Sequence, residues 1–414
     1  MSQSAADFLI AARQSEIRTL QHLLPRVRLV VIVSGLVHAL QRERGASGIF
    51  TGSRGQRFRQ QRRNLVSATD QQVLAFDQLL ADLERDEALQ QAGSHLLSRL
   101  ARVLHQLGRR DAILRGTARL EMDEDRIYDF YTGLIQDLLG VVFDIADTAT
   151  DSAVTRALVA LLHFMQGKEL AGQERALGAL RLASGRLCAQ RSEKLVVLQE
   201  GQRRSLEVFS RFADAGSLAV WQSWLADVSS QQALDDLRAH VVARQSESSS
   251  DADLSETWFA VCTARIDAMK AVEDQLSLHL RHAAEESLAA SRREFAACHR
   301  EVHALAQLDR LSEQPEAALV GDGEALRPGM RRSLIDLLEE QTSRLADLQE
   351  ALEQARTALA ERRLVDRAKA LLIRHRGLSE HEAHSLLRRM AMNQGCKLPE
   401  VARAVLNLSE VFDG

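Results

Sequence analysis

Apolar residues recur every three or four positions along almost the whole chain, which is the spacing of one face of an α-helix. The clearest case is the segment 27–44, whose apolar side is formed by Leu29, Val33, Leu36, Val37 and Leu40. We find no segment with the period of two that a strand requires. The pattern therefore predicts an all-α fold. The expected helices cover residues 5–24, 27–44, 56–80, 87–107, 111–120, 125–149, 155–166, 186–212, 218–227 and 254–311.

Two breaks are expected near the start of the chain. Pro25 should separate the first two helices, because proline removes a backbone hydrogen bond and clashes with the preceding turn. The second helix should end near Arg44, since the following segment RERGASGIFTGSRG contains four glycines and glycine is a weak helix former.

A linker divides the chain into two predicted domains. Residues 312–330 are rich in helix breakers, namely Pro315, Gly321, Gly323, Pro328 and Gly329. The N-terminal domain, residues 1–311, is expected to hold two helical bundles and to end in one long connecting helix, Leu254 to Leu311. The C-terminal domain, residues 331–414, is expected to begin with a coiled-coil helix and to end in a small three-helix module.

The predicted coiled-coil helix carries an apolar seam from Leu338 to Leu359, with Gln341 as its one polar position. Such a seam favours a homodimer. The alternative is a single helix that presents the same stripe to its own domain.

Composition agrees with helical bundles in a reducing compartment. Only 4 of the 414 residues are proline and only 4% are aromatic. The cysteines lie too far apart for a disulfide framework or a paired-cysteine zinc site; they are Cys188, Cys262, Cys298 and Cys396. The N-terminus has no secretion signal, and no apolar run approaches the ~20 residues that span a bilayer. We expect a soluble cytoplasmic protein without membrane contact or cofactor.

The C-terminal module is basic, although the chain as a whole has a formal net charge of -4. From Arg362 to Lys397, nine lysines and arginines are opposed by only three acidic residues. A polyanionic partner would explain this excess, because each cation placed against a phosphate gains affinity by counterion release; a solvated helix face is the alternative. Aromatic residues are absent from Leu364 to Glu410. Base stacking is therefore excluded there, and a helical surface that recognises a folded nucleic acid by shape is favoured.

Three arginines fall on apolar helix faces, where a charge needs a partner. Arg44 continues the stripe of the segment 27–44, Arg175 continues that of Leu162 and Met165, and Arg265 lies between Cys262 and Met269. Internal salt bridges would satisfy them, and the candidate acids are Glu43, Glu169, Glu174 and Asp267. The other interpretation is a pocket for a small planar oxyanion, whose oxygens match the forked donors of guanidinium.

The C-terminal module resembles the ANTAR domain, the RNA-binding module of bacterial transcription antitermination regulators. The resemblance rests on D-R-A-K at Asp366 to Lys369, G-L-S-E-x-E-A at Gly377 to Ala383, and L-R-R-x-A-M at Leu387 to Met392. It implies that basic residues of the module bind hairpins in leader mRNA. These residues are Arg367, Lys369, Arg374, Arg376, Arg388 and Arg389.

The N-terminal domain resembles the NIT domain, a helical domain that senses nitrate and nitrite, from about Val27 to Asp274. The matching segments are LQRERGASGIFTGS, KELAGQERALGA and WFAVCTARIDAMKAVED. The resemblance implies nitrate contacts at Arg44 and Arg265, with Arg175, Gly45 and Ser47 as further candidates. Together the two resemblances imply a regulator that prevents transcription termination upstream of nitrate assimilation genes in response to a small oxyanion.

Other classes of function compete with this one. A DNA-binding regulator could use Ser379 to Met392 as a recognition helix, and an adaptor could use the Leu338 to Leu359 seam for another protein. No phosphate loop, nucleophile elbow or H-E-x-x-H helix is present, which argues against an enzyme. Cys298 and His299 do not share a helix face, so a metal site is not expected there.

Overall fold

A computed structural model describes residues 5–85, 93–184, 189–243, 252–312, 328–378 and 380–412. Within these ranges all regular structure is helical, which confirms the predicted fold class. The helices are α1 (Ala5–Gly52), α2 (Arg59–Arg85), α3 (Ser94–Ala118), α4 (Glu124–Thr148), α5 (Ser152–Ser184), α6 (Ala189–Phe212), α7 (Ala215–Leu225), α8 (Val228–Ala243), α9 (Ala252–Ser312), α10 (Pro328–Arg376), α11 (Glu380–Gln394) and α12 (Leu398–Phe412).

Helix α1 is continuous, so the predicted breaks at Pro25 and after Arg44 are wrong. A proline inside a helix costs about 3 kcal/mol. Burying one Leu or Val side chain contributes about 1.5–3 kcal/mol, and Leu23 and Val27 on either side of the proline are both buried. Packing of the flanking turns therefore outweighs the local defect.

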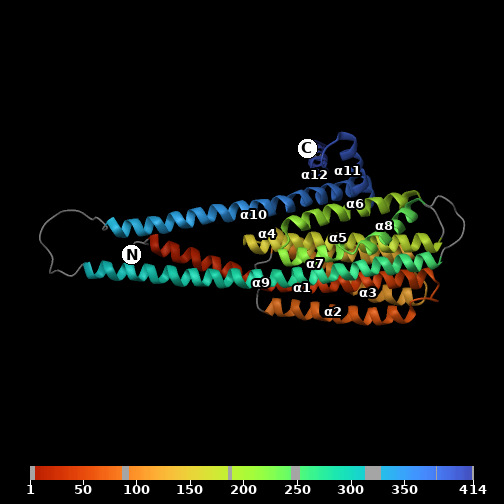
Figure 1. Cartoon of the computed structure of the whole chain (residues 1–414), viewed down its shortest axis with the longest axis horizontal. Coiled ribbons are helices and arrows are strands. Elements are labelled where there is room, and N and C mark those ends of the chain that lie inside the picture. Colours follow the sequence, from red (N-terminus) through yellow and green to blue (C-terminus); the bar gives the residue numbers. More distant parts are fainter. Residues whose placement is uncertain are drawn as a thin grey trace.

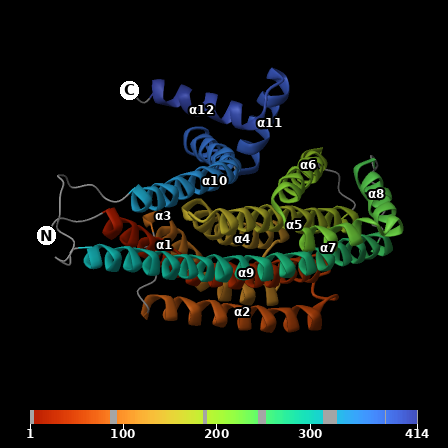
Figure 2. The ribbon, with the colours of Figure 1, turned by 60° about the vertical axis from the view of Figure 1, so that its left-hand side comes forward.

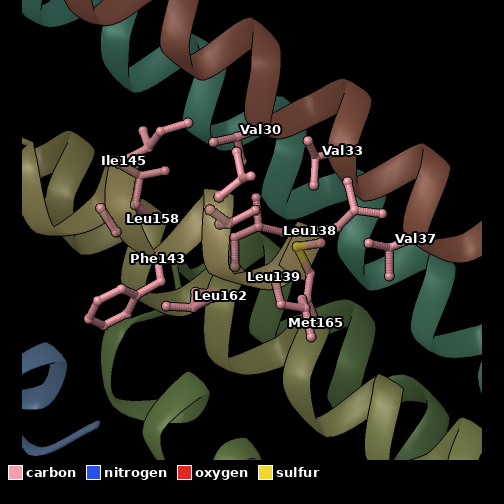
Figure 3. Close-up of a cluster of buried hydrophobic side chains, with 14 of the residues drawn as sticks. Val30, Val33, Val37, Leu138, Leu139, Phe143, Ile145, Leu158, Leu162 and Met165 are labelled. Atoms are coloured by element: carbon pink, nitrogen blue, oxygen red, sulfur yellow. The ribbon is translucent and has the colours of Figure 1, made fainter. Parts of the chain in front are cut away.

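The helices up to α9 form two bundles that lie side by side (Figure 1). In the first, α1 packs on α2 and α4, and α3 packs on α4. In the second, α5 packs along α6 and α9, with α8 against α9. Figure 3 shows the apolar junction between the bundles, where Val33 of α1, Leu138 of α4 and Leu162 of α5 belong to one cluster and Leu138 lies between the other two. These side chains are fully buried, because the apolar stripes seen in the sequence face one another.

Helices α1, α5 and α9 pack pairwise on one another, so they share one junction. Helix α9 extends well beyond both bundles, as the long predicted helix requires (Figure 1). Helix α10 returns alongside the bundles, and α11 and α12 lie at its end (Figure 2).

The C-terminal module shares its first helix with the predicted coiled-coil helix, since α10 runs without interruption from Pro328 to Arg376. Gly377 ends this helix with a φ of 63°, and its N–H donates to the carbonyl of Ile373 at 3.1 Å. Ala368, Leu387 and Val401 contribute to a separate small core of α10, α11 and α12. Ser379, at the start of the predicted recognition helix, lies outside the described residues.

The described end of the predicted dimer seam faces its own chain. Ala355 and Leu359 are 0% and 1% exposed and belong to the core of the N-terminal domain. This end of the seam therefore packs within its own chain, as in the single-helix alternative, but on the N-terminal domain rather than on the helix's own domain. The side chains of the seam positions from Leu338 to Leu348 lie outside the described residues, as does most of the predicted linker, and Leu352 is half-buried.

Two further helix boundaries differ from those predicted from the sequence, and one helix was missed. Residues 111–120 continue α3, and α5 runs on past residue 166 to Ser184, because glycine in a well-packed helix costs only about 1 kcal/mol. Helix α8 was not predicted, although Leu234, Leu237 and Val241 have helical spacing and are buried. The polar segment 246–253 lies mostly outside the described residues.

By length and composition α1 could cross a membrane, which the sequence pattern did not indicate. The apolar core helix of a helical bundle can have the same length and composition. In α1 the apolar side chains Val33, Leu36 and Leu40 are fully buried against other helices, so this helix is built as a bundle core.

Candidate functional site

The three predicted arginines are all buried, and each comes from a different helix of the shared junction. Arg44 of α1, Arg175 of α5 and Arg265 of α9 are 2%, 2% and 8% exposed. In each of them the Nε–H finds no acceptor in the described part of the chain. A buried donor without an acceptor costs about 1–3 kcal/mol. The junction therefore has cationic donor groups to offer to an anion.

Arg44 is held by the carboxylate of Glu169 from α5. Its Nη1 donates to Oε1 at 2.6 Å and its Nη2 to Oε2 at 3.2 Å. Nη1 also donates to Oγ1 of Thr132 at 3.1 Å, and the ring centroid of Tyr128 lies 5.7 Å from the guanidinium carbon. One of the internal salt bridges considered from the sequence is therefore present.

Arg175 has only neutral hydrogen-bond partners. Nη1 donates to Oγ1 of Thr263 at 3.0 Å, and Nη2 donates to the backbone carbonyl of Gln41 at 3.1 Å. The ring centroid of Phe259 lies 4.8 Å from its guanidinium carbon. Within the described ranges, no carboxylate comes within ion-pair distance of it. Burial, followed by the charge of Arg44, lowers the pKa of Arg175 to about 10, so the side chain is still charged at neutral pH.

Arg265 shares its carboxylate with another arginine. Its Nη1 donates to Oε1 of Gln202 at 2.7 Å and lies 3.6 Å from Oε2 of Glu174. Glu174 is bound more tightly by Arg238 of α8, whose Nε and Nη2 both donate to it at 2.8 Å. Burial, followed by the charge of Arg238, lowers the pKa of Arg265 to about 10. Two guanidinium groups thus share the buried carboxylate of Glu174.

Glycines let α1 and α5 cross closely at the arginines. A Cβ atom on Gly45 would lie 2.8 Å from Nη2 of Arg175, and one on Gly172 would lie 2.8 Å from Nη2 of Arg44. A residue with a Cβ atom at Gly45 would displace the guanidinium group of Arg175, and one at Gly172 would displace that of Arg44. The structure therefore brings Arg44, Arg175 and Gly45 together.

Arg265 lies in the adjacent cluster, and Cys262 of α9 connects the two. Burial raises the pKa of the Cys262 thiol to about 12, and the charges of Glu174, Arg175 and Arg265 also act on it. The thiol is therefore within electrostatic range of Arg175 and Arg265 alike.

Ser47 belongs to a different cluster, on another face of α1. Its Oγ accepts from Nε of Arg62 at 3.2 Å. Glu43, one turn earlier, accepts from Arg110 at 3.0 and 2.6 Å and from the hydroxyl of Tyr131. Because residues four apart share a helix face, Glu43 and Ser47 point away from Arg44. Glu43 is therefore a structural partner of Arg110.

Two glutamines complete the surroundings of Glu169, and the sequence analysis did not name them. Nε2 of Gln41 donates to Oε2 at 2.9 Å, and Nε2 of Gln173 donates to Oε1 at 2.8 Å. Gln41 precedes Arg44 by three residues, and Gln173 follows Glu169 by four. Helical spacing was therefore the signal that could have found them.

The predicted RNA-binding residues include exposed ones and ones that line a cleft, and Arg367 is both. The exposed ones are Arg374, Arg376 and Arg389, together with Arg367. Those that line a cleft between the N-terminal domain and the C-terminal module are Arg367, Lys369 and Arg388. Part of the basic surface therefore faces the N-terminal domain.

Ion pairs hold the C-terminal module against the N-terminal domain. Nη2 of Arg388 lies 2.5 Å from Oε1 of Glu200 on α6. Arg363 pairs with Asp147 at the end of α4. The guanidinium carbon of Arg362 lies 5.4 Å from the ring centroid of Phe143. These contacts occupy one cation of the predicted RNA-binding surface.

A metal ion has no evident site in the described ranges, which contain no group of three potential ligands. His299 and His303 are neighbours on α9, with ring centroids 5.9 Å apart.

Comparisons with known proteins match both parts of the chain. Residues 35–281 match the family model described as nitrate and nitrite sensing (NIT), and residues 353–406 match that of the ANTAR domain. A nitrate regulatory protein from Klebsiella oxytoca is 31% identical over 409 residues, which are 98% of this chain and 96% of the relative. The solved structure of the NasR transcription antiterminator matches with a TM-score of 0.63 and 28% identity, over 98% of this chain and 99% of the other.

Proposed function

The chain belongs to the nitrate- and nitrite-sensing NIT family and carries an ANTAR domain, and we propose that Arg44, Arg175 and Arg265 bind the anion. It is a transcription antiterminator of the NasR type, and this family of regulators is not enzymatic. The ANTAR domain binds RNA. The anion is thus the signal, and RNA binding is the response.

The observation that supports the anion site best is the buried charge of Arg175. A buried cation with neutral partners is costly, and a bound anion relieves that cost. Nitrate and nitrite are planar, and their oxygens match the forked donors of guanidinium. Arg44 supplies a second guanidinium beside it, and Arg265 supplies a third from the adjacent cluster. Gly45 provides the close approach of the two helices.

The C-terminal domain, residues 331–414, would supply the output. We propose that Arg367, Lys369, Arg374, Arg376, Arg388 and Arg389 bind hairpins of a leader mRNA. Two of them have acidic partners: Lys369 pairs with Asp366 of the same helix at 2.7 Å, and Arg388 pairs with Glu200 of α6. The Arg388 pair supports the proposal that the module can pack against the N-terminal domain in a position that covers part of its RNA surface.

Helix α5 connects the two sites. It carries Arg175 and Glu169 at one place and packs against α10 at another. An anion that draws α1, α5 and α9 together would shift α5 beneath α10. For typical allosteric coupling this requires a difference in affinity of about 1–3 kcal/mol between the two states. We further propose that the protein acts in the cytoplasm as a homodimer, to which the seam positions before Ala355 would contribute.

Calorimetric titration of the full chain tests the anion site. We expect nitrate and nitrite to bind, and chloride and sulfate to bind more weakly by about tenfold or more, because neither is a planar oxyanion. Equal affinity for sulfate and nitrate would contradict a site whose donors are arranged around a planar anion.

Reversing the charge of Glu200 tests whether the Arg388–Glu200 ion pair holds the C-terminal module against the N-terminal domain and covers part of its RNA surface. Glu200→Lys places two cations opposite each other in the cleft, so we expect the module to leave the N-terminal domain. RNA binding without nitrate should then rise by about fivefold or more, within the range of typical allosteric coupling. Filter binding to a hairpin RNA at fixed salt measures the effect.

The matched control is Glu207→Lys, a reversal on the same helix at a residue that pairs with Arg203. It adds the same charge to α6 without touching Arg388. Equal stimulation by both variants would mean that net charge, rather than release of the module, causes the effect.

A further inference from the structure

Glu169 is a fully hydrogen-bonded carboxylate at the helix junction, as is Glu174 in the adjacent cluster. Each oxygen of Glu169 accepts two N–H groups: Oε1 from Arg44 and Gln173, and Oε2 from Arg44 and Gln41. The carboxylate is 2% exposed. Four donors converge in this way on one planar pair of oxygens.

This donor set suits nitrate or nitrite as well as it suits a carboxylate. All three can present two oxygens of one planar centre, trigonal or bent, which is the shape that a guanidinium fork binds. Arg44 cannot offer both Nη groups to nitrate while Glu169 holds them. The carboxylate therefore occupies the place on Arg44 that the anion requires.

The other two arginines do not have this restriction. Arg175 has no carboxylate partner in the described ranges, and Arg265 lies 3.6 Å from a carboxylate that Arg238 already binds through two nitrogens. At Arg175 an incoming anion has no carboxylate to displace, and at Arg265 the nearest carboxylate is already bound by Arg238. Displacement is required only at Arg44.

A cleft beside Glu169 can accept the displaced side chain. Glu169 lines the cleft between the N-terminal domain and the C-terminal module, together with Tyr128, Thr132 and Gln173. A rotation of Glu169 toward this cleft would return its charge to a more polar environment. The same cleft reaches Thr132 and Tyr128, both of which contact Arg44.

We propose that Glu169 is a built-in competitor for the effector. Nitrate or nitrite replaces its carboxylate on Arg44, Gln41 and Gln173, and Glu169 thereby sets the anion concentration at which the protein responds. Because the donors are arranged around a planar group, the same exchange favours planar oxyanions over spherical and tetrahedral ones. This inference rests on the proposed anion site, since it names the group that the anion must displace.

The test is the nitrate dissociation constant of the full chain, measured by calorimetry for the wild type and for Glu169→Gln. The amide keeps the size of the side chain but loses its charge, and charge-assisted hydrogen bonds are about twice as strong as neutral ones. We expect nitrate to bind the variant about tenfold more tightly than the wild type. Glu169→Asp, which keeps the charge but cannot reach all four donors, should bind with intermediate affinity and serves if the first variant does not fold.

Glu43→Gln is the matched control. It makes the same change at a buried carboxylate on the neighbouring helix, one residue from Arg44, but in the Arg110 cluster. Its nitrate affinity should equal that of the wild type. Unchanged or weaker binding by both Glu169 variants, with normal wild-type binding, overturns the competitor role and leaves the anion site intact. Absence of nitrate binding from the wild type and all variants would instead remove the proposed site.

Discussion

Replacing Arg175 by methionine is expected to abolish nitrate sensing while leaving the protein folded. Losing one buried, charge-assisted anion contact costs about 2–5 kcal/mol, a fall in affinity of roughly 30-fold to several thousand-fold. Folding should not suffer, because an apolar side chain of similar length replaces a buried cation that has no acidic partner, and such replacements are often neutral or stabilising. Arg175→Met should therefore raise the thermal midpoint of the unliganded protein or leave it unchanged.

The two measurements are the thermal midpoint with and without nitrate and the calorimetric affinity. Arg156→Met is the matched control, since Arg156 is an exposed arginine of the same helix that bonds to the carbonyl of Arg211. It should keep the full nitrate response. A nitrate response in Arg175→Met as strong as that of the control would exclude Arg175 from the site.

Replacing Glu273 by leucine is expected to cause the largest loss of stability. Glu273 and Lys168 are both 0% exposed and form an ion pair of 2.5 Å between α9 and α5. Burial alone would raise the pKa of Glu273, but Lys168 and Lys270 hold it below its usual value. Glu273→Leu leaves the ammonium of Lys168 buried without a carboxylate, which costs about 3–5 kcal/mol.

The double variant Glu273→Leu with Lys168→Met distinguishes the loss of the ion pair from the loss of packing. Both charges are then absent, so the free energy of unfolding in urea should return to near the wild-type value or exceed it. Glu285→Leu, on the exposed side of α9, should change that free energy by only about 0.5 kcal/mol. If the double variant were as unstable as the single one, lost packing rather than the unpaired charge would be the cause.

These two experiments probe contacts of α5 that lie two turns apart, at Arg175 and at the Lys168 partner of Glu273. Lys168 and Glu169 follow each other on α5, and Arg175 lies two turns further on. Lys168 fixes α5 to α9, whereas Glu169 fixes it to α1. A change of partner at Glu169 therefore acts on a helix whose position against α9 is already set, and α10 packs on that helix.

Helix periodicity in the sequence predicted the class of fold and most of its elements, because burial in a bundle repeats every three or four residues. The predictions were wrong where local helix propensity and tertiary packing favour different structures. Pro25 and the glycines after Arg44 are unfavourable in an isolated helix, yet α1 passes through them because neighbouring helices cover it. The Leu338 to Leu359 seam had the pattern of a dimer, but its described end packs on its own N-terminal domain.

The sequence by itself determined that the protein is helical, that its C-terminal module is basic, and that Arg44, Arg175 and Arg265 point inward. These properties follow from residue type and spacing along one helix. Only the tertiary structure decided which acid faces which arginine: Glu169 binds Arg44, Glu174 binds Arg238, and Arg175 has neutral partners. Charge pairing depends on distances of a few ångströms between different helices, and helical periodicity gives the face of a residue but not its partner across the core.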